Sequence, residues 1–201
     1  MDLAFTTILR KEALASQTTI FRFNSRLSLE NVKQFEKINE LLMDKMYSVE
    51  LPEQIIFELD STNFKTYGKH YGSAYNYHYS STDYHPLLMF YYNRGDMENF
   101  IKEGKNGFAF DTMSSSEFIV NSNKLQLALL AYNFNNWVRR LVLIRSMKSN
   151  RIETIRMKLI KMAAKIVKGS RYLRFKLCNS CAYKEDFWIT LENINRLTIT
   201  P

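Results

Sequence analysis

The chain has 201 residues, of which 46% are hydrophobic and 14% aromatic, so we expect a folded protein and exclude a disordered one. No run of about 18 apolar residues occurs, which argues against a membrane span. The apolar stretch at the N-terminus is short and interrupted by charge, unlike a secretory signal. The two cysteines, Cys178 and Cys181, fit a reducing compartment, and we therefore predict a cytoplasmic protein.

The formal net charge of +8 is unevenly distributed. Residues 1–60 hold 7 basic and 10 acidic residues, whereas residues 61–201 hold 21 and 10. Between residues 139 and 176 there are 13 basic residues and one acid, Glu153. Such a block indicates a polyanionic partner, most simply nucleic acid, and the alternative is a solvated basic face.

A helix is predicted over residues 28–47, where Ser28 can cap the first turn. Apolar residues recur there at helical spacing: Val32, Phe35, Ile38, Leu42 and Met46. Pro52 interrupts the pattern, so we expect a helical N-terminal region over residues 1–50 and a second domain over 51–201.

Three strands are predicted next. Residues 53–60 form an apolar run that ends at Asp60, which is typical of a buried strand bringing a carboxylate to the edge of a sheet. Residues 73–80 alternate and are rich in tyrosine, and residues 86–92 are apolar and aromatic. Short connections between the three segments predict an antiparallel meander, and the fold class is α/β.

The remainder of the chain favours helices. The ranges expected to be helical are 91–105, 123–147, 151–168 and 185–196, and residues 171–177 are expected to form a last strand or extended segment. The C-terminal half is therefore expected to be mainly helical.

Four polar residues of the stretch 91–105 are spaced to share one helix face. Tyr91, Arg94, Glu98 and Lys105 lie within a stripe about 60° wide on an ideal helix. A carboxylate can hold a hard metal ion, while cations and a phenol can hold phosphates around it. The alternative is a solvated stripe of helix pairs.

The spacing Y-x2-R-x3-E-x6-K resembles the signature of a superfamily of bacterial insertion-sequence transposases with a DDE, ribonuclease-H-like catalytic domain. The segment LDSTNFKTYGKHYGSAYNYHY is similar to the first catalytic strand of that family. The phrases YHPLL, ENFIKEGKNGFAFD, LAYNFNNWVRRLVL and RYLRFKLCNSCAYK resemble its group-one members. The resemblance covers nearly all of the chain from the SQTT segment onward.

The resemblance implies that Asp60 and Glu98 are catalytic carboxylates and ligands of Mg²⁺. Arg94 and Lys105 would contact DNA phosphates, and Tyr91 would help to position the strand. Family enzymes hold two Mg²⁺ ions between three carboxylates for an in-line attack on phosphate.

One catalytic element of the family is missing here. A long segment that carries the second Asp, usually in a phrase like R-G-D-S-G-F, lies in the family between the third strand and the helix with the signature. In this chain the two join directly near Phe90–Tyr91. Asp83, Asp96 and Asp111 have no context that fits the missing residue. The sequence therefore predicts a truncated ribonuclease-H-like domain, a three-strand meander with a helical C-terminal half.

The predicted helix 151–168 carries a second basic surface. Five residues share a face about 100° wide and are the expected DNA contacts: Arg151, Lys158, Lys161, Lys165 and Lys168. The alternative is a solubilising stripe.

Two functional hypotheses follow from these residues. The first is a shortened transposase that binds DNA without cleaving it. The second is a non-catalytic DNA-binding or interaction protein that inhibits full-length transposase by sharing DNA or forming mixed complexes. DNA is the expected partner in both, with full-length transposase or a second copy as a possible protein partner, and neither a membrane nor a small-molecule substrate is expected.

Overall fold

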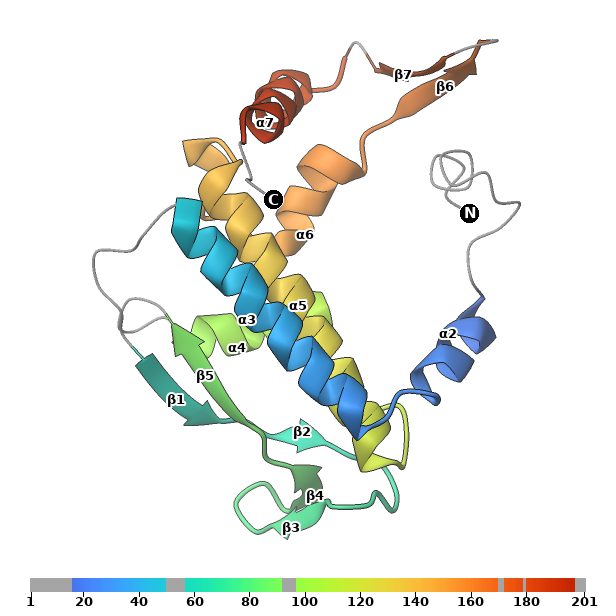
Figure 1. Ribbon diagram of the computed structural model, residues 1–201, viewed down its shortest axis with the longest axis vertical. Coiled ribbons are helices and arrows are strands. Elements are labelled where there is room, and N and C mark those ends of the chain that lie inside the picture. Colours follow the sequence, from blue (N-terminus) through green and yellow to red (C-terminus); the bar gives the residue numbers. More distant parts are fainter. Residues whose placement is uncertain (1–15, 50–56, 92–96, 170–171, 179, 198–201) are drawn as a thin grey trace. The chain divides into compact units, whose positions relative to one another are not determined.

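The computed structural model describes residues 16–49, 57–91, 97–169, 172–178 and 180–197 and is a mixed α/β structure with small antiparallel sheets (Figure 1). The described residues divide into two compact units, one spanning Leu27–Arg140 and the other Leu141–Leu197 together with residues 16–26. No helix in the described ranges is long and apolar enough to cross a membrane.

Two long helices lie side by side in the unit that spans Leu27–Arg140: α3 (Leu29–Val49) and α5 (Phe118–Leu141). The side-chain amide of Asn123 donates to the Ser28 carbonyl oxygen over 3.0 Å, and that of Asn133 donates to Asn39 over 2.8 Å. The paired positions rise together along both helices, so α3 and α5 run in the same direction. The predicted helix over 28–47 is confirmed, and α5 ends earlier than predicted.

The start of α3 is capped differently from the expectation. Asn31 accepts hydrogen bonds from both the backbone N–H (2.8 Å) and the hydroxyl (3.2 Å) of Ser28. This is the return half of a capping box, in which the side chain three residues into the helix satisfies the residue before it. Ser28 therefore precedes the first turn as predicted, but Asn31 supplies the acceptor.

A single antiparallel register joins two stretches of strand. β1 (Phe57–Ser61) pairs with β5 (Leu87–Tyr91), and β2 (Phe64–Lys65) pairs with β4 (Ser81–Tyr84) in the same register. Between them the Thr62 N–H donates to the Pro86 carbonyl oxygen over 3.3 Å. Pro86 has no N–H of its own to return a bond, which explains the break in the ladder at this point.

The predicted meander has the wrong strand order. The short strand β3 (Ala74–Asn76) pairs with β4 and not with β1, so the 81–91 stretch lies in the middle. The Tyr-rich segment around 73–80 is a brief edge strand followed by a turn, in which Ser80 has a positive φ of 49°. Tyr75 on this edge strand and Tyr77 and Tyr79 in the turn after it are all exposed.

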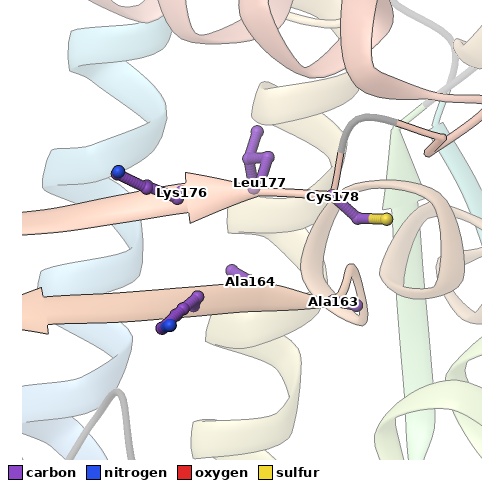
Figure 2. A pocket seen from close by; sticks show the side chains of 6 residues that line it. Ala163, Ala164, Lys176, Leu177 and Cys178 are labelled. Carbon is purple, nitrogen blue, oxygen red and sulfur yellow. The ribbon is translucent and has the colours of Figure 1, made fainter.

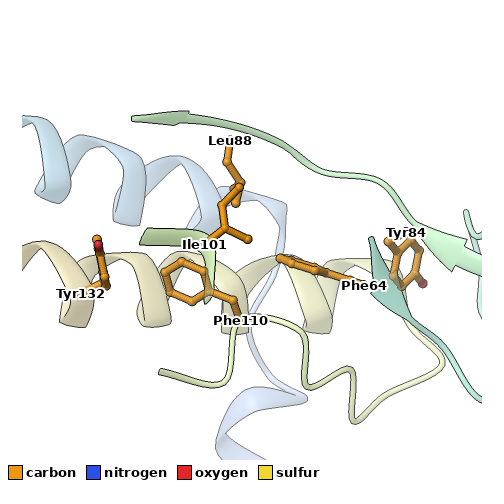
Figure 3. Packing of buried hydrophobic residues seen from close by; sticks show 6 residues of the cluster. All are labelled: Phe64, Tyr84, Leu88, Ile101, Phe110 and Tyr132. Carbon is orange, nitrogen blue, oxygen red and sulfur yellow. The ribbon is translucent and has the colours of Figure 1, made fainter. Parts of the chain in front are cut away.

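The core of this unit joins the strands to α4 (Met97–Phe108) and α5. Its buried members are Phe64, Tyr84, Leu88, Ile101, Phe110 and Tyr132 (Figure 3). The core residues that come from the strands, Phe64, Tyr84 and Leu88, all have even numbers in one register. Because side chains alternate along a strand, they point to the same face, which is the core face.

The end of α4 depends on a glycine. Ala109, with a φ of 56°, ends the helix in the left-handed conformation, and the Phe110 N–H donates to the Gly104 carbonyl oxygen over 3.2 Å. The Phe110 ring lies directly on Gly104, where a β-carbon would come within 2.3 Å of the ring. Glycine is therefore required at 104 for the fully buried ring to lie against the helix backbone.

The unit that contains Leu141–Leu197 is built from short elements. These are η1 (Arg145–Met147), α6 (Ile152–Ile155), the π-helical turn η2 (Arg156–Ile160), β6 (Ala164–Lys168), β7 (Leu173–Leu177) and α7 (Lys184–Arg196), with α2 (Gln17–Asn24) from the N-terminal segment. The Asn193 amide of α7 donates to the Val142 carbonyl oxygen over 2.8 Å. The predicted last strand and closing helix are confirmed.

The predicted helix over 151–168 is wrong beyond residue 160. Residues 164–168 form β6, which pairs with β7 as an antiparallel hairpin. β-Branched Ile166 and Val167 favour a strand, and the neighbouring strand β7 supplies the hydrogen bonds that a helix would otherwise provide. Gly169, expected to follow a helix, instead donates its N–H to the Tyr172 carbonyl oxygen in the hairpin turn over 2.8 Å.

We predict that Gly104→Ala lowers the free energy of unfolding by about 2 kcal/mol, because overpacking typically costs 1–3 kcal/mol and exceeds the gain of about 1 kcal/mol from helix propensity. Chemical denaturation measures the change. The matched control is Asn106→Ala, an exposed position on the same helix, which should be neutral or slightly stabilising. A Gly104→Ala variant as stable as the unmodified protein would show that the Phe110 ring does not need this contact.

Candidate active site

Asp60 lies on β1 directly opposite Leu88 of β5. Residues that face each other across an antiparallel pair point to the same side of the sheet. Leu88 is 5% exposed and belongs to the core, whereas Asp60 is exposed. The carboxylate therefore projects from the core face of the strands at a point that solvent reaches.

Helix α4 covers this same face. Ile101 belongs to the core cluster with Leu88, and Figure 3 shows the two side chains next to each other. One turn further on, the Lys105 ammonium donates to the Asn63 carbonyl oxygen over 2.9 Å and lies 5.7 Å from the centre of the Phe64 ring. These contacts fix α4 against β5, the partner strand of β1, and against β2.

Glu98 lies in the first turn of α4 and is exposed. It precedes Ile101 by three residues and Lys105 by seven, so the three side chains leave the helix within about 60° of one another. Two of the three contact the strands as described. Glu98 is thus on the side of α4 that faces the strands, toward the end nearer Asp60.

The predicted helix over 91–105 begins later than expected. Tyr91 is the last residue of β5 and pairs with Phe57, because the apolar and aromatic run 87–91 has a strand partner. The four signature residues therefore do not share one helix. Glu98 and Lys105 lie on α4, Tyr91 ends a strand, and Arg94 lies outside the described residues.

Asp83 is a buried carboxylate that the sequence does not place on a strand. It lies in β4, is 1% exposed, and its Oδ2 accepts hydrogen bonds from Asn63 (2.6 Å) and Ser81 (2.5 Å). Asp83 neighbours Tyr84, which is on the core face, so it points to the opposite face from Asp60. Its strand partner is Lys65, five residues and about 17 Å of strand from Asp60.

Of the other two acids considered for the missing position, Asp111 also fails to join the pair. Asp111 follows Phe110, whose N–H donates to the Gly104 carbonyl oxygen. Gly104 lies six residues, or about 9 Å of helix rise, beyond Glu98, so Asp111 is at the far end of α4. Asp96 lies outside the described residues. Sequence reasoning missed Asn63, which contacts both Lys105 and Asp83, and only its place three residues after Asp60 could have indicated it.

The described side chains do not fit a two-ion magnesium centre. Among them, no group of three or more His, Cys, Asp or Glu is close enough to hold a metal ion. A pair of metal ions about 4 Å apart needs ligands on both ions, and Mg²⁺ keeps several waters when carboxylates are few. Asp60 and Glu98 alone could hold at most one ion.

The predicted DNA contacts of 151–168 do not form one stripe. Arg151 is exposed just before α6, and Lys161 is exposed just after η2. The Lys158 ammonium lies 5.1 Å from the centre of the Tyr183 ring, a cation–π contact. Lys165 and Lys168 are both exposed on β6, but three residues apart on a strand they point to opposite faces.

Sequence comparison relates this chain to a known protein family. The model of the transposase DDE domain group 1 matches residues 1–92 and 88–199. No curated protein and no solved structure gave a significant match. Since the two matched segments together cover nearly the whole chain, this protein belongs to the family of transposases with a group 1 DDE domain.

Proposed function

We propose that this chain is a shortened DDE transposase that binds DNA and does not cleave it. The observation that carries the proposal is the packing of α4 on the strand face that bears Asp60, while the buried carboxylate of Asp83 points to the other face. Two acids of a catalytic centre are retained in this reading, and the third is absent.

Asp60 and Glu98 form the retained pair. Asp60 is the cross-strand neighbour of Leu88, Leu88 shares the core with Ile101, and Glu98 precedes Ile101 by about 4.5 Å of helix rise. These steps support a separation of roughly 10 Å or less between the two carboxylates, the separation expected of acids that flank one metal ion. Lys105 would have two roles: its hydrogen bond to the Asn63 carbonyl oxygen holds α4 on the strands, and its charge could attract a DNA phosphate.

The loss of an internal segment accounts for the missing acid. The family match is divided into residues 1–92 and 88–199, and the two parts overlap at residues 88–92, around the end of β5. A strand that carries Asp60, and a helix that carries Glu98 and packs on the same face of the neighbouring strands, support the proposal of a shortened ribonuclease-H-like domain. The family implies DNA as the partner and a divalent metal as the usual cofactor. We propose that this chain retains DNA binding and that its binding of the metal is weak.

DNA binding should be salt-sensitive and largely independent of sequence, because the basic residues between 139 and 176 are predicted to meet phosphates. If about five phosphates are contacted, log K falls with log[salt] with a slope near −4 to −5. Fluorescence anisotropy with a duplex of arbitrary sequence, measured over a range of salt concentrations, gives this slope.

A charge-matched pair of variants tests which lysines are responsible. One variant replaces four basic-region lysines by Gln: Lys158, Lys161, Lys165 and Lys168. The control replaces four lysines elsewhere: Lys33, Lys37, Lys45 and Lys69. The first should flatten the slope by about 2 and the second should leave it unchanged. Equal slopes for all three proteins would show that the basic region is only a solubilising face.

The purified protein should not nick supercoiled plasmid with Mg²⁺ or Mn²⁺. One loosely held ion cannot stabilise both the attacking and the leaving oxygen, and each 1.36 kcal/mol of lost transition-state stabilisation is about tenfold in rate. The assay is run beside Asp60→Ala and Glu98→Ala. Nicking by the unmodified chain that both substitutions abolish would mean that another acid completes the site.

A further inference from the structure

Strands β6 and β7 form a two-stranded ribbon with two unlike faces, here called the β6–β7 ribbon. Lys165 faces Lys176, and Val167 faces Arg174. The Cys178 N–H donates to the Ala163 carbonyl oxygen over 3.0 Å and extends the ladder by one pair in the same register. By strand alternation one face, the basic face, therefore carries Lys165, Arg174, Lys176 and Cys178.

The opposite face of the ribbon is mostly apolar. Ile166 faces Phe175 there, followed by Leu177, and Lys168 lies at the end near the turn. Phe175 is 43% exposed. A lone two-stranded ribbon is only marginally stable in water. Repulsion among the cations of its basic face destabilises it further unless a partner neutralises their charge.

The basic face is arranged for an anion. Lys165 and Lys176 are directly opposite each other, an arrangement that is destabilising for like charges. Both are exposed, as is Arg174, and within the described part of the chain no ion pair joins any of the three to an acid. Three cations held at cross-strand and diagonal spacing carry a concentrated positive charge.

An open hollow lies at the base of the ribbon, where Figure 2 labels Lys176, Leu177 and Cys178. It has a volume of about 400 Å³, and its lining consists of Ala163, Ala164, Lys165, Lys176, Leu177 and Cys178. The small alanine side chains leave room beside two ammonium groups. A phosphate group would meet both cations there without displacing a bulky side chain.

We propose that the β6–β7 ribbon, and not a helix, is the part of this region that docks on duplex DNA, with Lys165, Arg174 and Lys176 against the phosphate backbone. This inference rests on the proposed DNA binding, and it identifies the structural element that makes the contact. Two strands about 4.8 Å apart make a ribbon narrow enough for a major groove about 12 Å wide, and each DNA strand presents one phosphate per about 3.4 Å of helix axis along the edge of that groove. The geometry thus matches two or three neighbouring phosphates.

Cys178 provides a direct probe of the basic face. The chain has 2 cysteines, so Cys181→Ser leaves Cys178 as the single thiol. Cys178 is exposed and lines the hollow, and the hydrogen bond from Ser180 lowers the pKa of its thiol, which favours the reactive thiolate. In this variant we expect saturating duplex DNA at low salt to slow alkylation of Cys178 about tenfold or more, and high salt to restore the rate.

A matched pair of single substitutions tests the same face by affinity. Lys165→Gln and Lys168→Gln remove one charge each from the same strand, on opposite faces. Lys165→Gln should reduce the magnitude of the salt slope by about 1, and Lys168→Gln should reduce it clearly less, because its side chain lies on the opposite face of the ribbon. A single strand of equal length should protect Cys178 less than the duplex.

The outcomes separate this inference from the proposed function. If DNA binds with a steep salt dependence but Cys178 is not protected and the two substitutions act alike, the ribbon is not the docking element, although the protein still binds DNA. Stronger protection by the single strand would also overturn the duplex assignment. Absence of any DNA binding at low salt would overturn the proposed function itself.

Discussion

The position of α4 depends on a buried ion pair between Glu103 and Arg139. The guanidinium of Arg139 on α5 donates through both terminal nitrogens to the two carboxylate oxygens of Glu103, and the two side chains are only 11% and 13% exposed. Removing one partner of such a pair leaves an uncompensated buried charge, which typically costs 3–5 kcal/mol. On the other side of α4, Lys105 is bonded to Asn63 and Ile101 packs in the core with Leu88. The helix is therefore held between α5 and the strands, and Glu98 is positioned by contacts that it does not make itself.

The packing that positions α4 does not depend on a catalytic centre. Gly104, Phe110 and the ion pair are requirements of the core, and none of them needs a third acid beside Asp60 and Glu98. The ladder from Phe57 to Lys65 keeps one register on both sides of Pro86, so Asp60 is fixed relative to the core as firmly as Leu88. Arg139, counted among the basic residues of the sequence, is occupied inside this unit by Glu103. Most of the basic residues that remain to meet a partner follow Arg139 in the sequence. On the β6–β7 ribbon their positions are set by strand pairing.

Much of the fold could be predicted from periodicity, and the errors have a common cause. The helical spacing over 28–47 and 185–196 identified α3 and α7, and the strand ending at Asp60 was identified from its apolar run. Local pattern could not show that β4 would lie between β1 and β3, because pairing partners are chosen by long-range packing. The same limitation made the 151–168 pattern look helical, since the pairing of Ile166 with Phe175 is invisible in the sequence of either strand alone. For the site, Asp60, Glu98 and Lys105 fall on the expected strand and helix, whereas Tyr91 remained in the strand because Phe57 pairs with it.

The most direct test of the account is whether Asp60 and Glu98 act on one metal ion. Calorimetric titration with Mn²⁺ would compare the unmodified protein with Asp60→Asn, Glu98→Gln and the double variant, with Asp111→Asn as the control. If both carboxylates flank a single ion, each substitution should weaken binding about tenfold or more, and the double variant should be little weaker than either single one, because residues that share a ligand are strongly coupled. The Asp111→Asn variant should bind as the unmodified protein does. Two effects that add independently would contradict the account, since they would place Asp60 and Glu98 at separate sites.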